Sequence, residues 1–301
     1  MQRTTAFLRL AATGLLLSIA TLSSAADLES GKHLIKQSWS QESNYPRPYF
    51  VHLPQLAKSK PLPVLVFLHG NGGNAEGAMR GFVNKHPKIA QQYLLVFPEG
   101  YQKSWNIVSE RSRADDISFV EAVVRAVVSH DNASNEKVSL LGVSNGAALV
   151  NAFMIESDLS VVHNCITAVS PLNAYQFDGK HFRARGKDNA YRQQVKPQLG
   201  RRLLNISGTQ DHLVPYLGGP SPVIPAKDGK LTFVDAEEST YQWAKAMGYQ
   251  GRKLNSATSQ DASVEVFSYL NGDVVHFKVN GEGHGAFRAI DQEKLLQFLR
   301  H

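Results

Sequence analysis

The stretch Lys137-Val138-Ser139-Leu140-Leu141-Gly142-Val143-Ser144-Asn145-Gly146 decides the fold. Its first half has the apolar character of a strand, and residues 147–155 after it follow a helical pattern. A serine between two glycines at a strand-to-helix turn sits on a sharp bend, where a side chain at either flank would collide with the neighbouring backbone. The stretch therefore predicts that Ser144 presents its hydroxyl as a nucleophile at the carboxyl end of a sheet.

Short apolar runs on both sides of this stretch alternate with longer helical patterns, which is typical of a mostly parallel sheet flanked by helices. The run at 63–68 is apolar almost throughout and suits a central strand buried on both faces. Further strands are expected at 33–39, 49–53, 94–98, 165–169, 202–207, 264–270 and 274–279, of which the first two should form an antiparallel pair. Helices are expected at 116–129, where Asp115 or Asp116 caps the start, and at 238–247 and 287–299. The predicted class is α/β, with one catalytic domain over residues 27–301.

Residues 1–26 have the features of a signal peptide. They carry Arg3 and Arg9 without an acidic residue, then an apolar run too short for a membrane span, then small residues ending at Ala25 and Ala26. We expect cleavage after one of these alanines, no membrane span in the mature chain, and a secreted or periplasmic protein.

Composition excludes several classes of protein. The 301 residues are 43% hydrophobic and 19% charged, which fits a globular protein with a sizeable core. The single cysteine, Cys165, rules out an internal disulfide and any multi-cysteine metal site, and it lies in a strand-like run where a buried thiol is expected. The formal charge of +6 comes with no helix-turn-helix, zinc or aromatic-basic motif, so we expect no nucleic-acid partner. The oligomeric state is left open.

A basic excursion at 178–202 accounts for the positive charge, with eight Lys and Arg against two Asp. A solvated crossover loop and a lid facing the substrate are the two alternatives. We predict that it borders the catalytic mouth and favours substrates that carry a carboxylate.

A nucleophilic serine needs a base that removes its proton. In this type of fold the acid and then the histidine follow the serine along the chain. His284, in a flexible turn after the last expected strand, is the base that we predict. Five other histidines follow Ser144 and are less suitable. His163 precedes any credible acid, His181 lies in the basic excursion, and His212 directly follows the acid. His276 lies inside an expected strand, and His301 ends the chain.

The acid that orients the base is expected directly after a strand. Asp211 ends the run Gly208-Thr209-Gln210-Asp211 behind the strand at 202–207, whereas its rivals Asp228 and Asp235 follow no strand immediately. The oxyanion formed during acyl transfer needs two backbone N–H donors. We predict the N–H of Asn145 and that of Asn71, which lies in the glycine-rich loop after the third strand.

The assembled residues resemble the α/β-hydrolase superfamily, and within it the secreted poly(3-hydroxybutyrate) depolymerase and feruloyl esterase family. The matching stretches are Leu68-His69-Gly70, Phe97-Pro98-Glu99-Gly100, Trp105-Asn106, residues 115–119, Gly142-Val143-Ser144-Asn145-Gly146, Gly208-Thr209-Gln210-Asp211, Val214-Pro215-Tyr216 and Gly281-Glu282-Gly283-His284. The resemblance implies a triad of Ser144, Asp211 and His284, no metal or cofactor, and hydrolysis of carboxylic esters through an acyl-enzyme. The chain departs from the family at Asn71, where a Cys is usual, and at 285–287, where the family has Trp-Pro.

The leading hypothesis is an exported serine esterase acting on hydroxyalkanoate oligomers or feruloyl-type aryl esters. Trp105 and Tyr216 are its candidate substrate-binding residues, although Trp105 taken alone fits core packing better. A serine peptidase of the same fold and a non-catalytic envelope-binding protein on a hydrolase scaffold are the alternatives.

Overall fold

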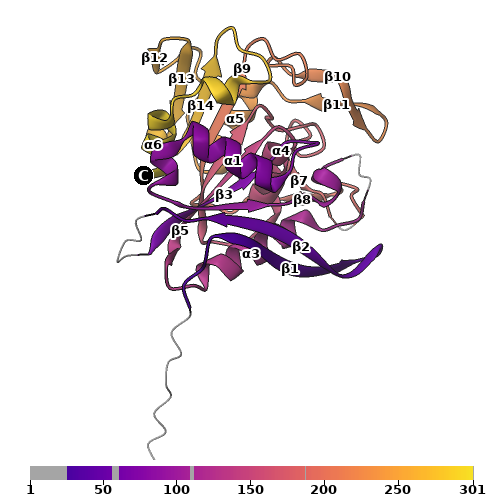
Figure 1. Cartoon of the computed structure of the whole chain (residues 1–301). Coiled ribbons are helices and arrows are strands. Elements are labelled where there is room, and N and C mark those ends of the chain that lie inside the picture. The colour runs from indigo at the N-terminus through magenta and orange to yellow at the C-terminus, as the bar shows by residue number, and fades with distance from the viewer. Residues whose placement is uncertain (1–25, 56–60, 109–111, 187, 301) are drawn as a thin grey trace, which may run out of the picture.

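The computed structural model describes residues 26–55, 61–108, 112–186 and 188–300, and within these residues ten strands form one mixed sheet (Figure 1). Its central strands run parallel: β4 (Leu94–Pro98), β3 (Leu62–Leu68), β5 (Ala133–Val143), β6 (Val162–Ala168), β9 (Arg202–Gly208) and β14 (Val274–Val279). Antiparallel strands complete both edges: β1 (Gly31–Trp39) and β2 (Glu42–His52) beyond β4, and β13 (Val264–Tyr269) and β12 (Ser259–Asp261) beyond β14. The α/β class, the nine expected strands and the opening antiparallel pair are confirmed.

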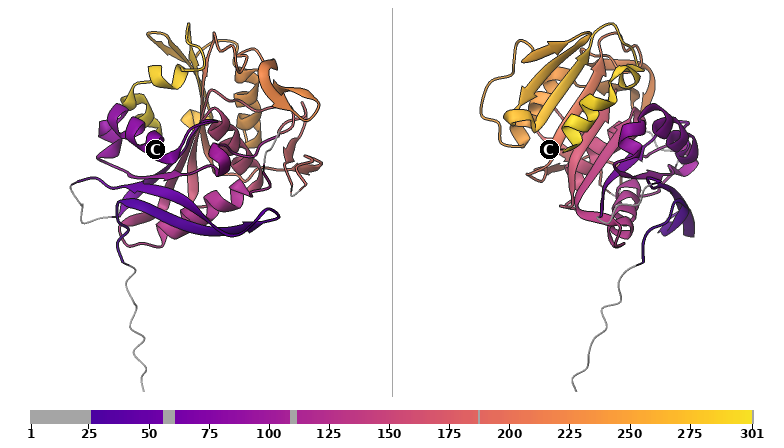
Figure 2. Two further views of the ribbon diagram at one scale, coloured as in Figure 1. Left: turned by 45° about the vertical axis from the view of Figure 1, so that its right-hand side comes forward. Right: turned by 60° about the vertical axis from the view of Figure 1, so that its left-hand side comes forward.

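Alternate side chains of the central strands enter two separate cores. On β3, Val64, Val66 and Leu68 pack on one face, and Leu65 and Phe67 on the other. The first face is covered by α3 (Asp116–Val128), α4 (Asn145–Glu156) and α5 (Ala236–Ala246). The second is covered by α1 (Ala75–Lys85), α2 (Pro87–Ala90) and α6 (Gln292–Arg300), as Figure 2 shows. Helices on both faces explain why β3 and β4 are apolar throughout.

The predicted helix at 287–299 is wrong in one respect, because it is two helices. A short 3-10 helix, η3 (Ala286–Ala289), ends at Ile290, which is extended and buried. The Asp291 side chain then accepts a hydrogen bond from the N–H of Glu293 at 2.7 Å, and α6 begins. Ala286, Phe287 and Ile290 pack into the core on that face of the sheet.

Several elements were not predicted from the sequence. Helix α1 buries only Ala75 and Phe82 and contains two glycines, so its helical pattern is weak. Two hairpins lie outside the main sheet: β7 (Phe182–Ala184) with β8 (Gln193–Val195), and β10 (Gly219–Ala226) with β11 (Gly229–Phe233). Two further 3-10 turns are η1 (Tyr101–Lys103) and η2 (Leu270–Gly272).

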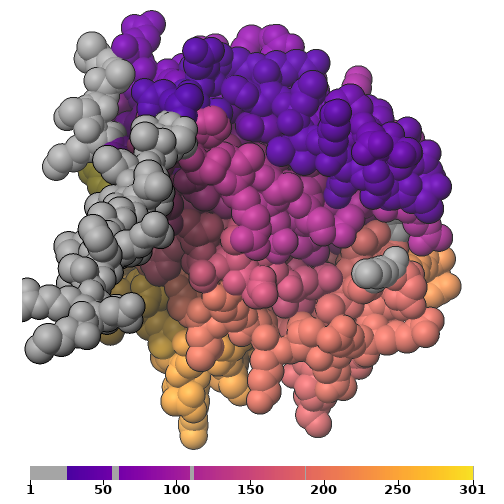
Figure 3. Space-filling view, turned by 90° about the horizontal axis from the view of Figure 1, so that it is seen from below, coloured from indigo at the N-terminus to yellow at the C-terminus, as the bar shows by residue number. Residues whose placement is uncertain are grey.

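A buried ion pair attaches the N-terminal hairpin to α3. The Arg47 guanidinium donates to Asp116 at 2.7 Å, and both side chains are almost completely buried. Arg47 also lies over the Phe119 ring, 3.7 Å from its centroid. Asp115, the residue before, accepts from the N–H of Ser118 and caps the helix, as predicted. In Figure 3 the hairpin (indigo) forms one border of the surface beside the segment that contains α3 (magenta).

The basic excursion at 178–202 does not border the cavity described below, which corrects the prediction made from its charge. None of its described residues lines that cavity, and Lys187 lies outside the described residues. Arg201 is buried and donates to the carbonyls at the end of α4, which a helix leaves without partners. Arg202 binds Asp273 at 2.9 Å, and Arg183 binds Asp178. These three cations brace the fold.

Cys165 lies on β6 and is completely buried, and burial raises its thiol pKa to about 12. Residues 1–25, where the signal peptide is expected, lie outside the described residues. Across the part of the chain that the structure describes, no helix combines the length and the apolar character needed to cross a bilayer.

Candidate active site

Ser144 lies at the turn between β5 and α4 in a backbone conformation that L-residues rarely adopt, with φ 54° and ψ −117°. Both flanking glycines are sterically required. A Cβ at Gly142 would lie 2.2 Å from the carbonyl oxygen of Gly146, and a Cβ at Gly146 would lie 2.2 Å from that of Leu68. The N–H of Ser144 donates to the carbonyl of Ala168 at 2.8 Å and fixes the turn against β6. The sequence folds this way because a strained serine is held between two residues that have no side chain.

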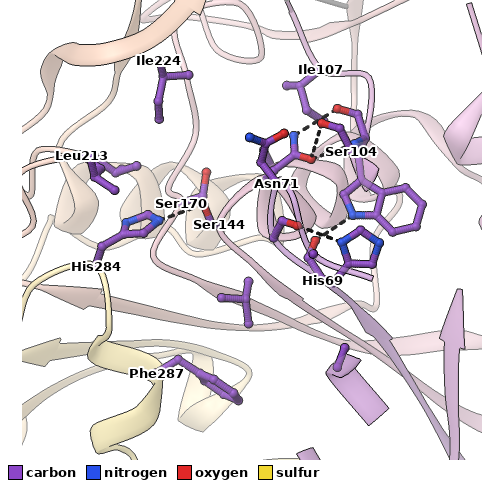
Figure 4. Close-up of a pocket in the computed structure, with 18 of the residues that line it drawn as sticks. His69, Asn71, Ser104, Ile107, Ser144, Ser170, Leu213, Ile224, His284 and Phe287 are labelled. Carbon is purple, nitrogen blue, oxygen red and sulfur yellow. Dashed lines mark hydrogen bonds between the residues drawn. The ribbon is translucent and has the colours of Figure 1, made fainter. Parts of the chain in front are cut away.

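The structure brings Ser144, His284 and Asp211 together from three separate strand ends. Ser144 Oγ lies 2.8 Å from His284 Nε2, and His284 Nδ1 lies 2.7 Å from Asp211 Oδ2. With the Nδ1 proton directed at the carboxylate, Nε2 accepts from the serine hydroxyl. Figure 4 shows His284 pointing at Ser144. This is the arrangement that a base-activated nucleophile requires.

Asp211 is held rigidly at the end of β9. Its Oδ1 accepts from the N–H groups of Leu213 and Val214 at 2.8 and 2.9 Å, which leaves Oδ2 for the imidazole. The Asp211 side chain is 3% exposed, whereas that of His284 is 26% exposed. The loop that carries His284 approaches closely because Gly208 has no side chain: a Cβ there would lie 2.3 Å from the carbonyl of Glu282. The acid is therefore buried and fixed, and the base faces the solvent-accessible side.

The two predicted oxyanion donors both lie beside Ser144. Asn145 begins α4 and Asn71 belongs to the loop after β3, and both line the cavity around the serine. The next two amides of that loop are already used, since Gly72 donates to the carbonyl of Lys103 and Gly73 to that of Gly70. Within the described residues, the N–H groups of Asn71 and Asn145 have no acceptor. They are the donors left for a bound oxyanion.

The Asn145 side chain holds a second loop in place, which sequence reasoning missed. Its Oδ1 accepts from the N–H of Trp105 at 2.8 Å and from Ser104 Oγ at 3.2 Å, and its Nδ2 donates to the carbonyl of Trp105 at 3.0 Å. The Trp105 indole in turn donates to the carbonyl of His69 at 2.8 Å (Figure 4). Trp105 is 3% exposed, so it packs in the core, and it also lines the cavity; its role in substrate binding stays a prediction.

His69 supports the oxyanion loop from behind. Its Nδ1 donates to the carbonyl of Gly70 at 2.8 Å while its Nε2 accepts from the N–H of Gly100 at 3.0 Å. Burial lowers the pKa of His69, which keeps the ring neutral and suits one donated and one accepted hydrogen bond. Both partners of this contact lie in stretches that carry the family resemblance, Leu68-His69-Gly70 and Phe97-Pro98-Glu99-Gly100, and this could have pointed to it.

A cavity of about 1340 Å³ opens at Ser144 and extends to both sides of it. One part is apolar and is lined by Leu213 and Val214 from the turn after Asp211, and by Val223, Ile224, Leu231 and Phe233 from the β10–β11 hairpin. The other part runs along α1 and η3 and includes Gly81, Phe82 and Phe287. In Figure 4 Ile224 and Phe287 lie on opposite sides of the Ser144–His284 pair. A bound ester therefore has room on both sides of its carbonyl.

Tyr216 does not line this cavity, which corrects its prediction as a substrate-binding residue. Its side chain is buried behind β14, where the hydroxyl donates to Glu237 at 2.9 Å and contacts His276 Nε2 at 2.9 Å. Asn205 donates to the other ring nitrogen of His276, and burial lowers the pKa of that imidazole to about 3. The turn after Asp211 directs Val214 into the cavity and Tyr216 away from it.

The rivals of the predicted acid and base lie elsewhere. His276 belongs to the buried network behind β14, His212 is exposed, and Asp235 caps α5 through the N–H of Glu238. No group of three or more His, Cys, Asp or Glu residues in the described ranges is placed to share a metal ion.

Comparisons with known proteins agree with this geometry, although no family model matches. Feruloyl esterase B of Piromyces equi is 25% identical over 231 residues, which cover 75% of this chain and 40% of the relative. Acetylxylan esterase of Coprinopsis cinerea is 32% identical over 110 residues, 34% of this chain and 29% of the relative. The chain thus spans less than half the length of these curated relatives.

Solved structures show the same fold. The acetyl xylan esterase from Aspergillus awamori superposes with a TM-score of 0.60 at 13% identity, over 90% of this chain and 99% of that one. A thermostable esterase gives a TM-score of 0.55 at 12% identity, over 89% and 62%. Together these comparisons show that the chain has the α/β-hydrolase fold and that its sequence is similar to those of a feruloyl esterase and an acetylxylan esterase.

Proposed function

We propose that this protein is an exported serine hydrolase of carboxylic esters, and one observation carries the proposal. The continuous hydrogen-bonded chain Ser144–His284–Asp211 opens into a large cavity in which two backbone N–H groups stand free beside the nucleophile. Each part has one chemical role in acyl transfer, and the relatives named above are esterases.

The mechanism follows from the distances. Ser144 Oγ attacks the ester carbonyl carbon while its proton passes to His284 Nε2, 2.8 Å away. Asp211 stabilises the imidazolium that forms, and the N–H groups of Asn71 and Asn145 donate to the oxyanion. His284 then returns the proton to the leaving alcohol. The acyl-enzyme is hydrolysed by water in the same two stages, with His284 as the base.

The shape of the cavity supports esters with substantial groups on both sides. Its volume of about 1340 Å³ exceeds the roughly 300–1,000 Å³ of common ligand pockets. Its walls are mostly apolar or aromatic, as an aryl acyl group or a short hydroxyalkanoate oligomer requires. Feruloyl-type aryl esters are the substrates we favour, because a feruloyl esterase matches most of the chain; hydroxyalkanoate oligomers are the alternative. The signal-peptide pattern of residues 1–26 supports export.

The test is hydrolysis of 4-nitrophenyl esters of increasing acyl length, methyl ferulate and hydroxybutyrate oligomers by the wild type and two serine variants. Ser144→Ala should reduce turnover to the uncatalysed rate and lose labelling by a fluorophosphonate probe. Ser129→Ala, at an exposed serine after α3, should keep both. Normal turnover by Ser144→Ala, or a wild type that hydrolyses none of these esters and takes up no probe, would refute the proposal.

A further inference from the structure

The part of the cavity along α1 is the only charged part that the described residues form. Lys85, from the end of α1, and Arg288, from η3, line it, and no Asp or Glu of the described chain does. We call this part the cationic arm and define it by Gly81, Phe82, Lys85, His86, Phe287 and Arg288. The opposite part, at the β10–β11 hairpin, has apolar walls. The cavity is therefore electrically asymmetric about Ser144.

Both cations of the cationic arm are free to bind a ligand. The Lys85 and Arg288 side chains are exposed, and neither forms an ion pair with any residue that the structure describes. Neighbouring cations behave differently: Lys88 binds Glu293, and Arg80 binds Glu76. Asp291, close to His86, is occupied at the start of α6 and does not line the cavity. Two unpaired cations on the wall of a cavity without carboxylates attract an anion.

The walls of the cationic arm are built to hold an organic group and not merely an ion. The His86 ring contacts the rings of both Phe82 and Phe287 in a tilted arrangement, with centroids 4.6 and 5.6 Å away. The contact between the His86 and Phe287 rings joins the two chain segments that carry the cations, since Lys85 directly precedes His86 and Arg288 directly follows Phe287. Gly81 faces open space, since a Cβ added there would have nothing within 4 Å. The missing side chain keeps the cationic arm wide.

His86 also leaves a polar atom unused. Its side chain is 2% exposed, and its Nδ1 is buried without a hydrogen-bond partner among the described residues. Burial, with a smaller effect from the charge of Lys85, lowers its pKa to about 4, so the ring is neutral at ordinary pH. A buried polar atom that has no partner is costly, and this one lies in the wall of the cationic arm.

From this arrangement we infer that the cationic arm binds a free carboxylate carried by the ester substrate, so that the enzyme prefers esters with an anionic end. The inference rests on the proposed function for its substrate, and it specifies that substrate's charge. The group that fits has an apolar or aromatic body against Phe82 and Phe287 and a carboxylate at Lys85 and Arg288. This assigns the anionic preference to a different place from the excursion at 178–202.

The experiment compares two pairs of substrates that differ only in charge. In the first pair, the mono-4-nitrophenyl ester of adipic acid carries a carboxylate on the acyl half, and its terminal amide is the neutral partner. In the second pair, 4-acetoxybenzoate carries the carboxylate on the alcohol half, and 4-acetoxybenzamide is the neutral partner. The readout is the ratio of kcat/KM for the anion to kcat/KM for the amide. We expect a wild-type ratio of about 5 to 30 in one pair, because two charge-assisted contacts act in a half-open site. Raising the salt to 1 M should reduce it.

Two double variants separate a local contact from a general charge effect. Lys85→Ala/Arg288→Ala should bring the ratio close to one. Lys180→Ala/Lys196→Ala removes the same charge from exposed positions outside the cavity and should keep the wild-type ratio. A wild-type ratio near one in both pairs, or an equal fall in the two double variants, would overturn the inference.

A binding measurement keeps the inference testable if no ester is turned over. Ser144→Ala can be titrated calorimetrically with 4-acetoxybenzoate, adipate monoester and their amides. Tighter binding of one anion by at least about fivefold, lost in Ser144→Ala/Lys85→Ala/Arg288→Ala, supports the cationic arm even without turnover. Equal affinities for anion and amide contradict it. If the anion binds more tightly than its amide but the wild type hydrolyses neither, the esterase proposal is wrong and the inference about the cationic arm still holds.

Discussion

Replacing Asp211 by Asn tests the geometry of the site most directly, because the new amide has one favourable orientation. In the wild type the N–H groups of Leu213 and Val214 both donate to Oδ1, and His284 Nδ1 donates to Oδ2. The asparagine will keep its oxygen on the two backbone donors and turn its NH2 group toward His284. Nδ1 must then become an acceptor, which moves the ring proton to Nε2.

That tautomer directs a proton at the Ser144 hydroxyl, so Nε2 no longer accepts from it. The expected loss is about 10⁴-fold in kcat, equivalent to about 5 kcal/mol of transition-state stabilisation. The melting temperature should change by only a few degrees, since both backbone hydrogen bonds of the side chain remain. Asp211→Ala serves as the control, because it also removes the acceptor of both N–H groups, of which that of Val214 is buried, and should destabilise the protein.

The assay is the steady-state hydrolysis of a short 4-nitrophenyl ester, with the Ser144→Ala rate subtracted as background. A fall in kcat of less than tenfold in a stably folded Asp211→Asn variant would refute the reasoning. It would mean that Asp211 does not determine which nitrogen of His284 carries the proton.

Three further outcomes concern stability. Gly146→Ala should unfold the protein or lower its free energy of unfolding by more than about 3 kcal/mol, since the new Cβ would lie 2.2 Å from a backbone oxygen. Gly81→Ala, where a Cβ meets nothing, should be neutral or stabilising by about 0.5–1 kcal/mol. Denaturant titration of both variants is the test. Arg47→Met should lower the free energy of unfolding by about 3–5 kcal/mol, because it leaves the buried Asp116 carboxylate without its partner. Adding Asp116→Leu should recover part of that loss in chemical denaturation, and no recovery would contradict this prediction. Burial lowers the pKa of His276 from 6.5 to about 3, so between these pH values the unfolded chain binds a proton that the folded chain does not. The free energy of unfolding should therefore be highest above pH 6.5 and fall as the pH drops toward 3. His276→Gln should make this fall less steep.

The sequence predicted the central sheet well because its strands are buried on both faces. β3 is apolar along its whole length and β5 is mostly apolar from Val138 onward, and such runs leave few alternatives. Elements at the surface were harder to foresee. Helix α1 buries two side chains, and the β10–β11 hairpin contains three prolines and is largely exposed, so neither has a strong hydrophobic period.

The predicted triad residues meet because each lies in the turn or loop that follows a parallel strand, and the ends of parallel strands gather at one edge of a sheet. Tyr216 shows where this reasoning stops. It lies five residues past Asp211, and whether its side chain enters the cavity depends on the turn between them, which composition does not determine. The prediction that the 178–202 excursion borders the cavity failed for a similar reason. Arg201 and Arg202 donate to carbonyls at the ends of helices, and these contacts are with residues far away in the sequence.

The single thiol of Cys165 has a practical consequence. It is buried at the centre of the sheet and its pKa is raised to about 12, so a disulfide reagent meets almost no thiolate while β6 stays paired with β5 and β9. The rate of its modification under native conditions is therefore a clock for the opening of the central sheet. Colour release by such a reagent would time that opening without any engineered label, and an added ligand that slows the clock would be one that binds the closed form.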